Sequence, residues 1–95
     1  MKLTIQSFEN GGPIPAEFAM GIPAEAGQAT FGPNLSPHLL WADEPKGTRS
    51  FALICTDVDA PSVRDDANQP GRTVPYDLPR ADFYHWVLVD IPADI

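Results

Sequence analysis

The stretch Ser50–Ser62 most constrains what this chain can fold into. Its apolar beginning is long enough for a buried strand and too short to identify a helix. Pro61 near its end limits further strand pairing, because proline has no backbone N–H to donate. The stretch therefore predicts a strand over residues 48–56 that delivers Asp57 and Asp59 to its open end.

A second apolar and aromatic run, Phe83–Ile91, is rich in residue types that favour strands. The 95 residues include 11 prolines and 7 glycines, which favour short strands and structured loops over long helices. We therefore expect a mostly β chain. The expected elements are strands over 3–8, 39–42, 48–56 and 83–91, a helical turn within 15–20, an irregular segment over 13–37 with one short strand, and a long loop over 57–82.

The unbroken apolar stretch within 48–56 predicts that both faces of its strand are covered. Cys55 lies in that stretch and is expected to be a small buried hydrophobe. As the only cysteine, it excludes an intrachain disulfide and a zinc site built from several thiolates. So few strands would leave bare edges if they stood alone. We expect residues 1–95 to be the N-terminal portion of a single larger domain, with the remainder beyond 95 or in a separate chain.

The charge pattern argues against two classes of partner. The formal net charge is −7, from 13 acidic and 6 basic residues. Scattered bases cannot follow a phosphate backbone or an anionic lipid surface, so we expect neither nucleic-acid binding nor adsorption to lipid by bulk charge. No stretch has membrane-spanning length and no secretory signal is recognisable, so we expect a cytoplasmic protein. The six bases are Lys2, Lys46, Arg49, Arg64, Arg72 and Arg80.

Strand periodicity suggests where the polar side chains meet. Alternate residues of a strand share a face, which puts Asp57 and Asp59 on one side of their strand unless a bulge intervenes. If the strand containing His85 is the neighbour, Asp57 can meet that imidazole. A carboxylate beside an imidazole fixes its tautomer and leaves a partly positive donor for an anion. Asp57 and His85 are therefore the candidate site.

Several other interpretations remain open. An Asp-x-Asp sequence before a proline commonly accepts backbone N–H bonds in a loop, and a single histidine is commonly structural. Asp57, Asp59 and His85 could hold a metal ion if another ligand came from elsewhere. Ser62 with His85 and an aspartate could form a nucleophilic triad, although Ser62 lacks a nucleophile-elbow sequence. The Asp57–His85 pair could also act as a general acid and base in a hydrolase or transferase.

Several motifs, taken together, resemble the phosphatidylethanolamine-binding protein family. The first is Asp57–Ser62 and the second, about twenty residues later, is Tyr84–Trp86. Two further segments, Ser36–Trp41 and Gly47–Leu53, resemble its bacterial branch, the Raf-kinase-inhibitor-like YbhB/YbcL type. The order and spacing of these motifs make the resemblance specific, and it extends from about Asn34 to the end of the chain.

The resemblance implies an antiparallel Greek-key β-sandwich with a small surface pocket for phosphate-type anions, incomplete within these 95 residues. By position, the ligand-binding residues would be Asp57, Pro61 and His85, with Asp59 bracing the loop and Phe83 forming an aromatic wall. The family also uses a second histidine and a Gly-Pro-rich segment later in the chain, and neither occurs in these residues. The chain thus carries half of such a pocket.

Two details depart from the family pattern. Val58 stands between the acids where the family has proline, which changes loop stiffness without changing a donor or acceptor. The segment 63–82 is longer than in many relatives, and we expect it to shape the pocket entrance.

The function expected from the resemblance is non-enzymatic binding of phosphate-type anions or phospholipid head groups, without a cofactor or metal. A regulatory role through protein partners is a further possibility that the resemblance leaves open. Kinase inhibition, after which the bacterial branch is labelled, is not expected of this chain on that ground. The alternatives are the acid/base enzyme and an inhibitor or interaction protein acting through 63–82. The partners considered are the phosphate-type anion or phosphoethanolamine, the C-terminal remainder of the domain, a protein target and a second copy in a homodimer.

Overall fold

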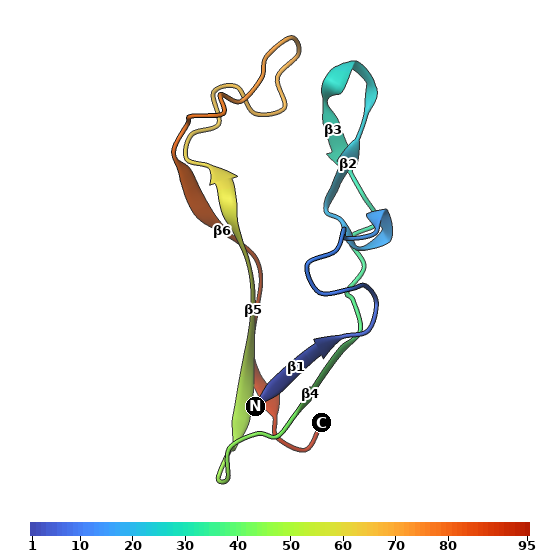
Figure 1. The fold of residues 1–95 in the computed structure, drawn as a ribbon, viewed down its shortest axis with the longest axis vertical. Coiled ribbons are helices and arrows are strands. Elements are labelled where there is room, and N and C mark those ends of the chain that lie inside the picture. Colours follow the sequence, from blue (N-terminus) through green and yellow to red (C-terminus); the bar gives the residue numbers. More distant parts are fainter. The chain divides into compact units, whose positions relative to one another are not determined.

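The computed structural model describes residues Met1–Ile95 as two units, Met1–Pro45 and Lys46–Ile95 (Figure 1). All strand pairs are antiparallel and the only helices are two short 3-10 turns, which confirms the mostly β prediction. The Greek-key sandwich itself remains a prediction. The elements are β1 Lys2–Ile5, η1 Ala16–Phe18, β2 Gly21–Pro23, η2 Glu25–Gly27, β3 Ala29–Phe31, β4 Leu39–Ala42, β5 Ser50–Pro61 and β6 Arg80–Pro92.

In the first unit, β1 pairs with β4, and β4 has the bounds predicted from the sequence. The backbone N–H of Gln6 extends this pairing by donating to the carbonyl of His38 at 3.2 Å. The His38 N–H in turn donates to Ser7 Oγ at 2.8 Å. The Ser7 side chain therefore continues the hydrogen bonding beyond the end of β1. The strand itself ends at Ile5, three residues before the predicted end at Phe8.

The segment 13–37 contains a hairpin, β2 with β3, where one short strand was expected. The helical turn expected within 15–20 is present as η1. Beyond β3, the chain stays close to the end of η1, because a Cβ on Gly32 would lie 2.4 Å from the carbonyl oxygen of Ala19. Only glycine allows that approach.

The second unit is built on the β5–β6 hairpin, in which the two apolar runs of the sequence pair with each other (Figure 1). Both strands are longer than predicted, so the connecting loop covers 62–79 and not 57–82. The reason is that Ala60 pairs with Ala81, and Pro61 pairs with Arg80 as the last residue of the strand. Asp57 and Asp59 consequently lie within β5 and not in a loop.

The prediction that both faces of the central strand are covered is wrong for these residues. Ile54 is 58% exposed and Cys55 is exposed, because β5 and β6 form a two-stranded ribbon with no third strand in their sheet. Ile91, opposite Phe51 in the ladder, is the only buried hydrophobic residue. Such a ribbon has little apolar burial of its own to stabilise it.

Candidate functional site

Bulges in the β5–β6 ladder place the candidate side chains. Cys55 pairs with Trp86 and the next residue, Thr56, pairs with Tyr84, so His85 is an extra residue in β6. Beyond the Asp57–Phe83 pair, the ladder shifts again before Ala60. Bulges change the direction of side chains and are common beside functional sites. The two strands are neighbours, which was the condition under which Asp57 was expected to meet His85, and the motif residues lie beside shifts in their pairing.

Asp57 and His85 are brought together across this ladder. Asp57 Oδ2 lies 4.0 Å from His85 Nε2, with 46% of the Asp57 side chain and 33% of the His85 side chain exposed. This separation permits attraction between charges but is too long for a direct hydrogen bond. The predicted proximity is therefore present, whereas the bond by which the carboxylate would fix the imidazole tautomer is not made.

The other oxygen of the Asp57 carboxylate forms a hydrogen bond within β5. Asp57 Oδ1 accepts a 2.8 Å hydrogen bond from the backbone N–H of Asp59. This contact is the local acceptor role that an aspartate takes in turns. The Asp57 side chain thus holds the backbone at Asp59, while the bracing role of Asp59 implied by the resemblance stays a prediction. The Asp59 side chain instead lines an open hollow of about 450 Å³ with Tyr76 and Arg80.

Phe83 packs against the His85 ring. The two ring centroids are 4.8 Å apart with an interplanar angle of 64°, an edge-to-face arrangement. Such arrangements match the positive edge of one ring to the negative face of another. Phe83 is half-buried and pairs with Asp57 in the ladder. The wall position implied for Phe83 by the family resemblance is thus directly beside the imidazole.

Arg64 also belongs to this cluster, and sequence reasoning missed it. Its guanidinium carbon lies 5.9 Å from the centroid of the Phe83 ring, at the limit of a cation–π contact. The sequence signal was weak, since Arg64 is one of six scattered bases and lies outside the compared motifs. Its position depends on how the loop after β5 returns toward β6.

The structure gathers some predicted residues and separates others. Asp57, Phe83 and His85 lie together, and the Arg64 guanidinium lies over the Phe83 ring. Pro61 is half-buried four residues along β5, opposite Arg80. The contacts of His85 are with Asp57 and Phe83 and do not include Ser62, whose N–H donates to the carbonyl of Pro79 at 3.2 Å.

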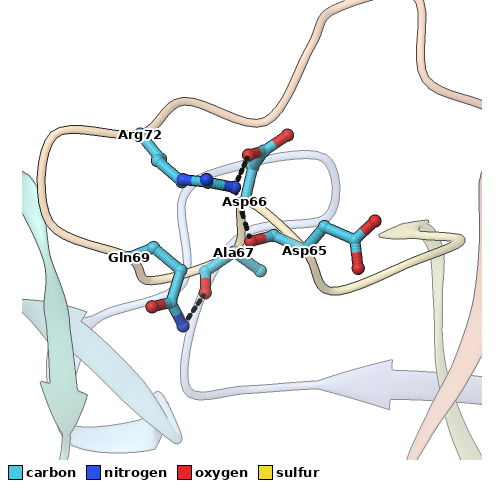
Figure 2. A network of polar contacts seen from close by, with 5 residues as sticks. All are labelled: Asp65, Asp66, Ala67, Gln69 and Arg72. Atoms are coloured by element: carbon cyan, nitrogen blue, oxygen red, sulfur yellow. Dashed lines mark hydrogen bonds and ion pairs between the residues drawn. The ribbon is translucent and has the colours of Figure 1, made fainter.

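A polar network orders the loop beside this cluster (Figure 2). Arg72 Nη1 lies 3.0 Å from Asp66 Oδ1 and 3.5 Å from the carbonyl oxygen of Asp65. Gln69 Nε2 donates to the carbonyl of Ala67 at 3.4 Å. In Figure 2 the carboxylate of Asp65 points away from Arg72, so the backbone of Asp65 and not its charge takes part. The loop is therefore folded on itself by its own side chains.

No group of three His, Cys, Asp or Glu side chains is arranged so that it could hold a metal ion. Neither of the two short 3-10 turns has the length and apolar character needed to cross a bilayer.

Comparison with known proteins agrees with the motifs. The family model described as "Phosphatidylethanolamine-binding protein" matches residues 4–95. The UPF0098 protein YbhB of Escherichia coli strain K12 is 33% identical over 94 residues, covering 99% of this chain and 46% of that relative. A UPF0098 protein of Aquifex aeolicus is 33% identical over 93 residues, covering 98% of this chain and 38% of the relative.

The UPF0098 protein YbcL of E. coli is 34% identical over 64 residues, covering 67% of this chain and 26% of the relative. The chain thus spans less than half the length of these curated relatives. No solved structure gives a significant match. Because the family model covers nearly all of the residues and the YbhB and YbcL relatives match as well, this chain belongs to the phosphatidylethanolamine-binding protein family.

Proposed function

We propose that this protein binds phosphate-type anions, free or as phospholipid head groups, at the surface formed by Asp57, Phe83 and His85. One observation carries the proposal: the His85 ring lies against Phe83 and near Asp57 while a third of its side chain, 33%, remains exposed. A ring held on one side and open on the other can donate to a ligand without first losing its own packing. Membership of the family supports a ligand-binding role in general.

Binding would depend on charge-assisted hydrogen bonds. A protonated imidazole donates through a nitrogen, and a bond to a charged phosphate oxygen is shorter and stronger than a neutral one. Phe83 covers one side of the donor and limits the access of competing water. The nearby Asp57 carboxylate would repel an anion, so the ligand must approach the His85 ring from a direction away from Asp57.

The proposed role is non-enzymatic. An acid/base enzyme needs its catalytic pair within hydrogen-bond reach of the reacting group, together with a nucleophile or an activated water. The 4.0 Å Asp57–His85 separation and the absence of a hydroxyl, thiol or amine among the contacts of His85 favour a binding site. Action within the cytoplasm, and regulation through a protein target, the remainder of the domain or a second copy, are extensions of the same proposal.

A titration of the full-length protein tests the proposed function. Phosphoethanolamine is added while the ring signals of both histidines are followed by NMR, and His38, the only other histidine, is the internal control. We expect the His85 signals to move in a saturable way and those of His38 to stay in place. His85→Ala should abolish the saturable response.

Two results would contradict the proposal. If the His85 signals do not move, or if His85→Ala binds phosphoethanolamine as well as the unsubstituted protein does, the anion is not held at this surface. Hydrolysis of a phosphoester panel that disappears in His85→Ala would favour the acid/base enzyme instead.

A further inference from the structure

We infer that Arg64 is a second cation of the candidate site and makes it select phosphate monoesters, which are dianions, over phosphodiesters. This inference rests on the proposed function. It adds a residue outside the motifs and narrows the ligand from any phosphate-type anion to those with a doubly charged phosphoryl group. Soluble phosphomonoesters would then be preferred to intact phospholipids, whose phosphate is a diester.

The position of Arg64 follows from two contacts of one ring. The Arg64 guanidinium carbon lies 5.9 Å from the Phe83 centroid, and the His85 ring lies 4.8 Å from the same centroid. Arg64 and His85 are therefore separated by no more than the sum of these distances, comparable with a Debye length of roughly 10 Å at 0.1 M salt. An anion beside Phe83 would therefore lie within reach of both the Arg64 charge and the N–H donor of the His85 ring.

Within residues 1–95 the charge of Arg64 is not neutralised by a carboxylate. In the same loop, the Asp66 carboxylate forms its ion pair with Arg72, at 3.0 Å, and not with Arg64 (Figure 2). Arg80 Nη2 donates to the carbonyl of Pro75 at 3.3 Å. Arg64 is exposed and forms no ion pair with a carboxylate, so only the Phe83 ring holds it. Its five N–H donors are free to meet phosphate oxygens.

The local balance of charge explains why such a residue is needed. Asp57 lies 4.0 Å from His85 and Asp59 is two residues further along β5. The His85 imidazole can carry at most one positive charge, so without Arg64 these two carboxylates would outweigh it. The positive charge of Arg64 offsets the negative charge of one of these two carboxylates. Since the Coulomb energy between Arg64 and a ligand is proportional to the ligand charge, a dianion gains about twice as much from it as a monoanion.

The test compares two ligands and three variants of the full-length protein. The ligands are phosphoethanolamine, a monoester, and glycerophosphoethanolamine, a diester, with dissociation constants measured by calorimetry at pH 8 and low salt, where the monoester is mostly a dianion. Arg64→Gln removes the charge and Arg64→Lys retains it without the planar fork. Arg49→Gln is the matched control, because Arg49 precedes β5 at the end away from the site and its loss changes net charge equally.

We expect Arg64→Gln to weaken monoester binding by about two- to fivefold, the range measured for exposed charge pairs. The loss for the diester should be about the square root of that factor. Arg64→Lys should fall between the wild type and Arg64→Gln, and Arg49→Gln should bind both ligands as the wild type does.

Each failure has a separate meaning. If Arg64→Gln and Arg49→Gln behave alike, or if Arg64→Gln weakens both ligands equally, the role of Arg64 is refuted, while the proposed function stands as long as His85→Ala still loses binding. If the unsubstituted protein binds neither ligand, the proposed function fails and this inference fails with it.

Discussion

Substitution of Asp57 separates two roles that one carboxylate performs. Its Oδ1 accepts the Asp59 N–H at 2.8 Å, and its Oδ2 faces His85 Nε2 at 4.0 Å. In Asp57→Asn the amide oxygen can still accept from Asp59, but the oxygen that faces His85 is replaced by an uncharged NH₂ group. Asp57→Ala removes both the acceptor and the charge. The difference between the two variants isolates the hydrogen bond within β5.

The magnitudes follow from the two distances. A hydrogen bond to a charged group contributes about 1.5–3 kcal/mol, and the 46% exposure of Asp57 places this one at or below the lower limit. The attraction of unit charges 4 Å apart in water is about 1 kcal/mol before screening by salt. We expect Asp57→Asn to lower the free energy of unfolding by less than about 1 kcal/mol, and Asp57→Ala by about 1–2 kcal/mol.

Urea unfolding of the full-length protein measures both losses, and amide hydrogen exchange reports on the bond itself. The Asp59 amide should exchange at nearly the wild-type rate in Asp57→Asn and clearly faster in Asp57→Ala. If the two variants are equally stable and their Asp59 amides exchange equally, the 2.8 Å bond does not stabilise β5. The reasoning about the roles of this carboxylate would then be wrong.

Three further predictions concern packing. Gly32→Ala should destabilise the protein by about 1–3 kcal/mol in urea unfolding, because its Cβ would lie 2.4 Å from a backbone carbonyl; Gly21→Ala, whose Cβ meets nothing closer than 3.9 Å, is the control and should change much less. Cys55 should react promptly with an aromatic disulfide reagent in the native protein, since its side chain is exposed, and a protected thiol would contradict the open face of β5. Phe83→Leu should move the NMR ring signals of His85, because it removes the ring 4.8 Å away, and unchanged signals would exclude that contact.

Local patterns in the sequence predicted the strands better than their ends. Leu39–Ala42 was predicted with its bounds, and the two apolar runs were correctly predicted to be strands, which the structure pairs as β5 and β6. The end of β5 was placed too early because polar residues and proline normally mark a loop. Here Ala60 and Pro61 are still paired with β6, a cross-strand partnership that no local pattern encodes.

The site was predicted in part for the same reason. Alternation within strands correctly brought Asp57 close to His85, but it could not show the bulge at His85 or the 4.0 Å gap. Arg64 was missed because its place over Phe83 depends on the path of the loop. Cys55 was expected to be buried, but it is exposed in residues 1–95. An apolar run indicates that a strand can be covered on both faces, but it does not say which segment of the chain covers them.

The irregular pairing around the site has a consequence for how such a site can vary. The extra residue in β6 at His85 is followed by an extra residue in β5 between Asp57 and Ala60, so the two offsets cancel. Ala60 and Pro61 thus pair with β6 in the same alignment as the residues from Leu53 to Cys55. The part of the hairpin that carries Asp57 and His85 therefore lies between two stretches of ladder that have the same register. Changes confined to that part can alter recognition while the strand ends that carry the loop 62–79 keep their alignment.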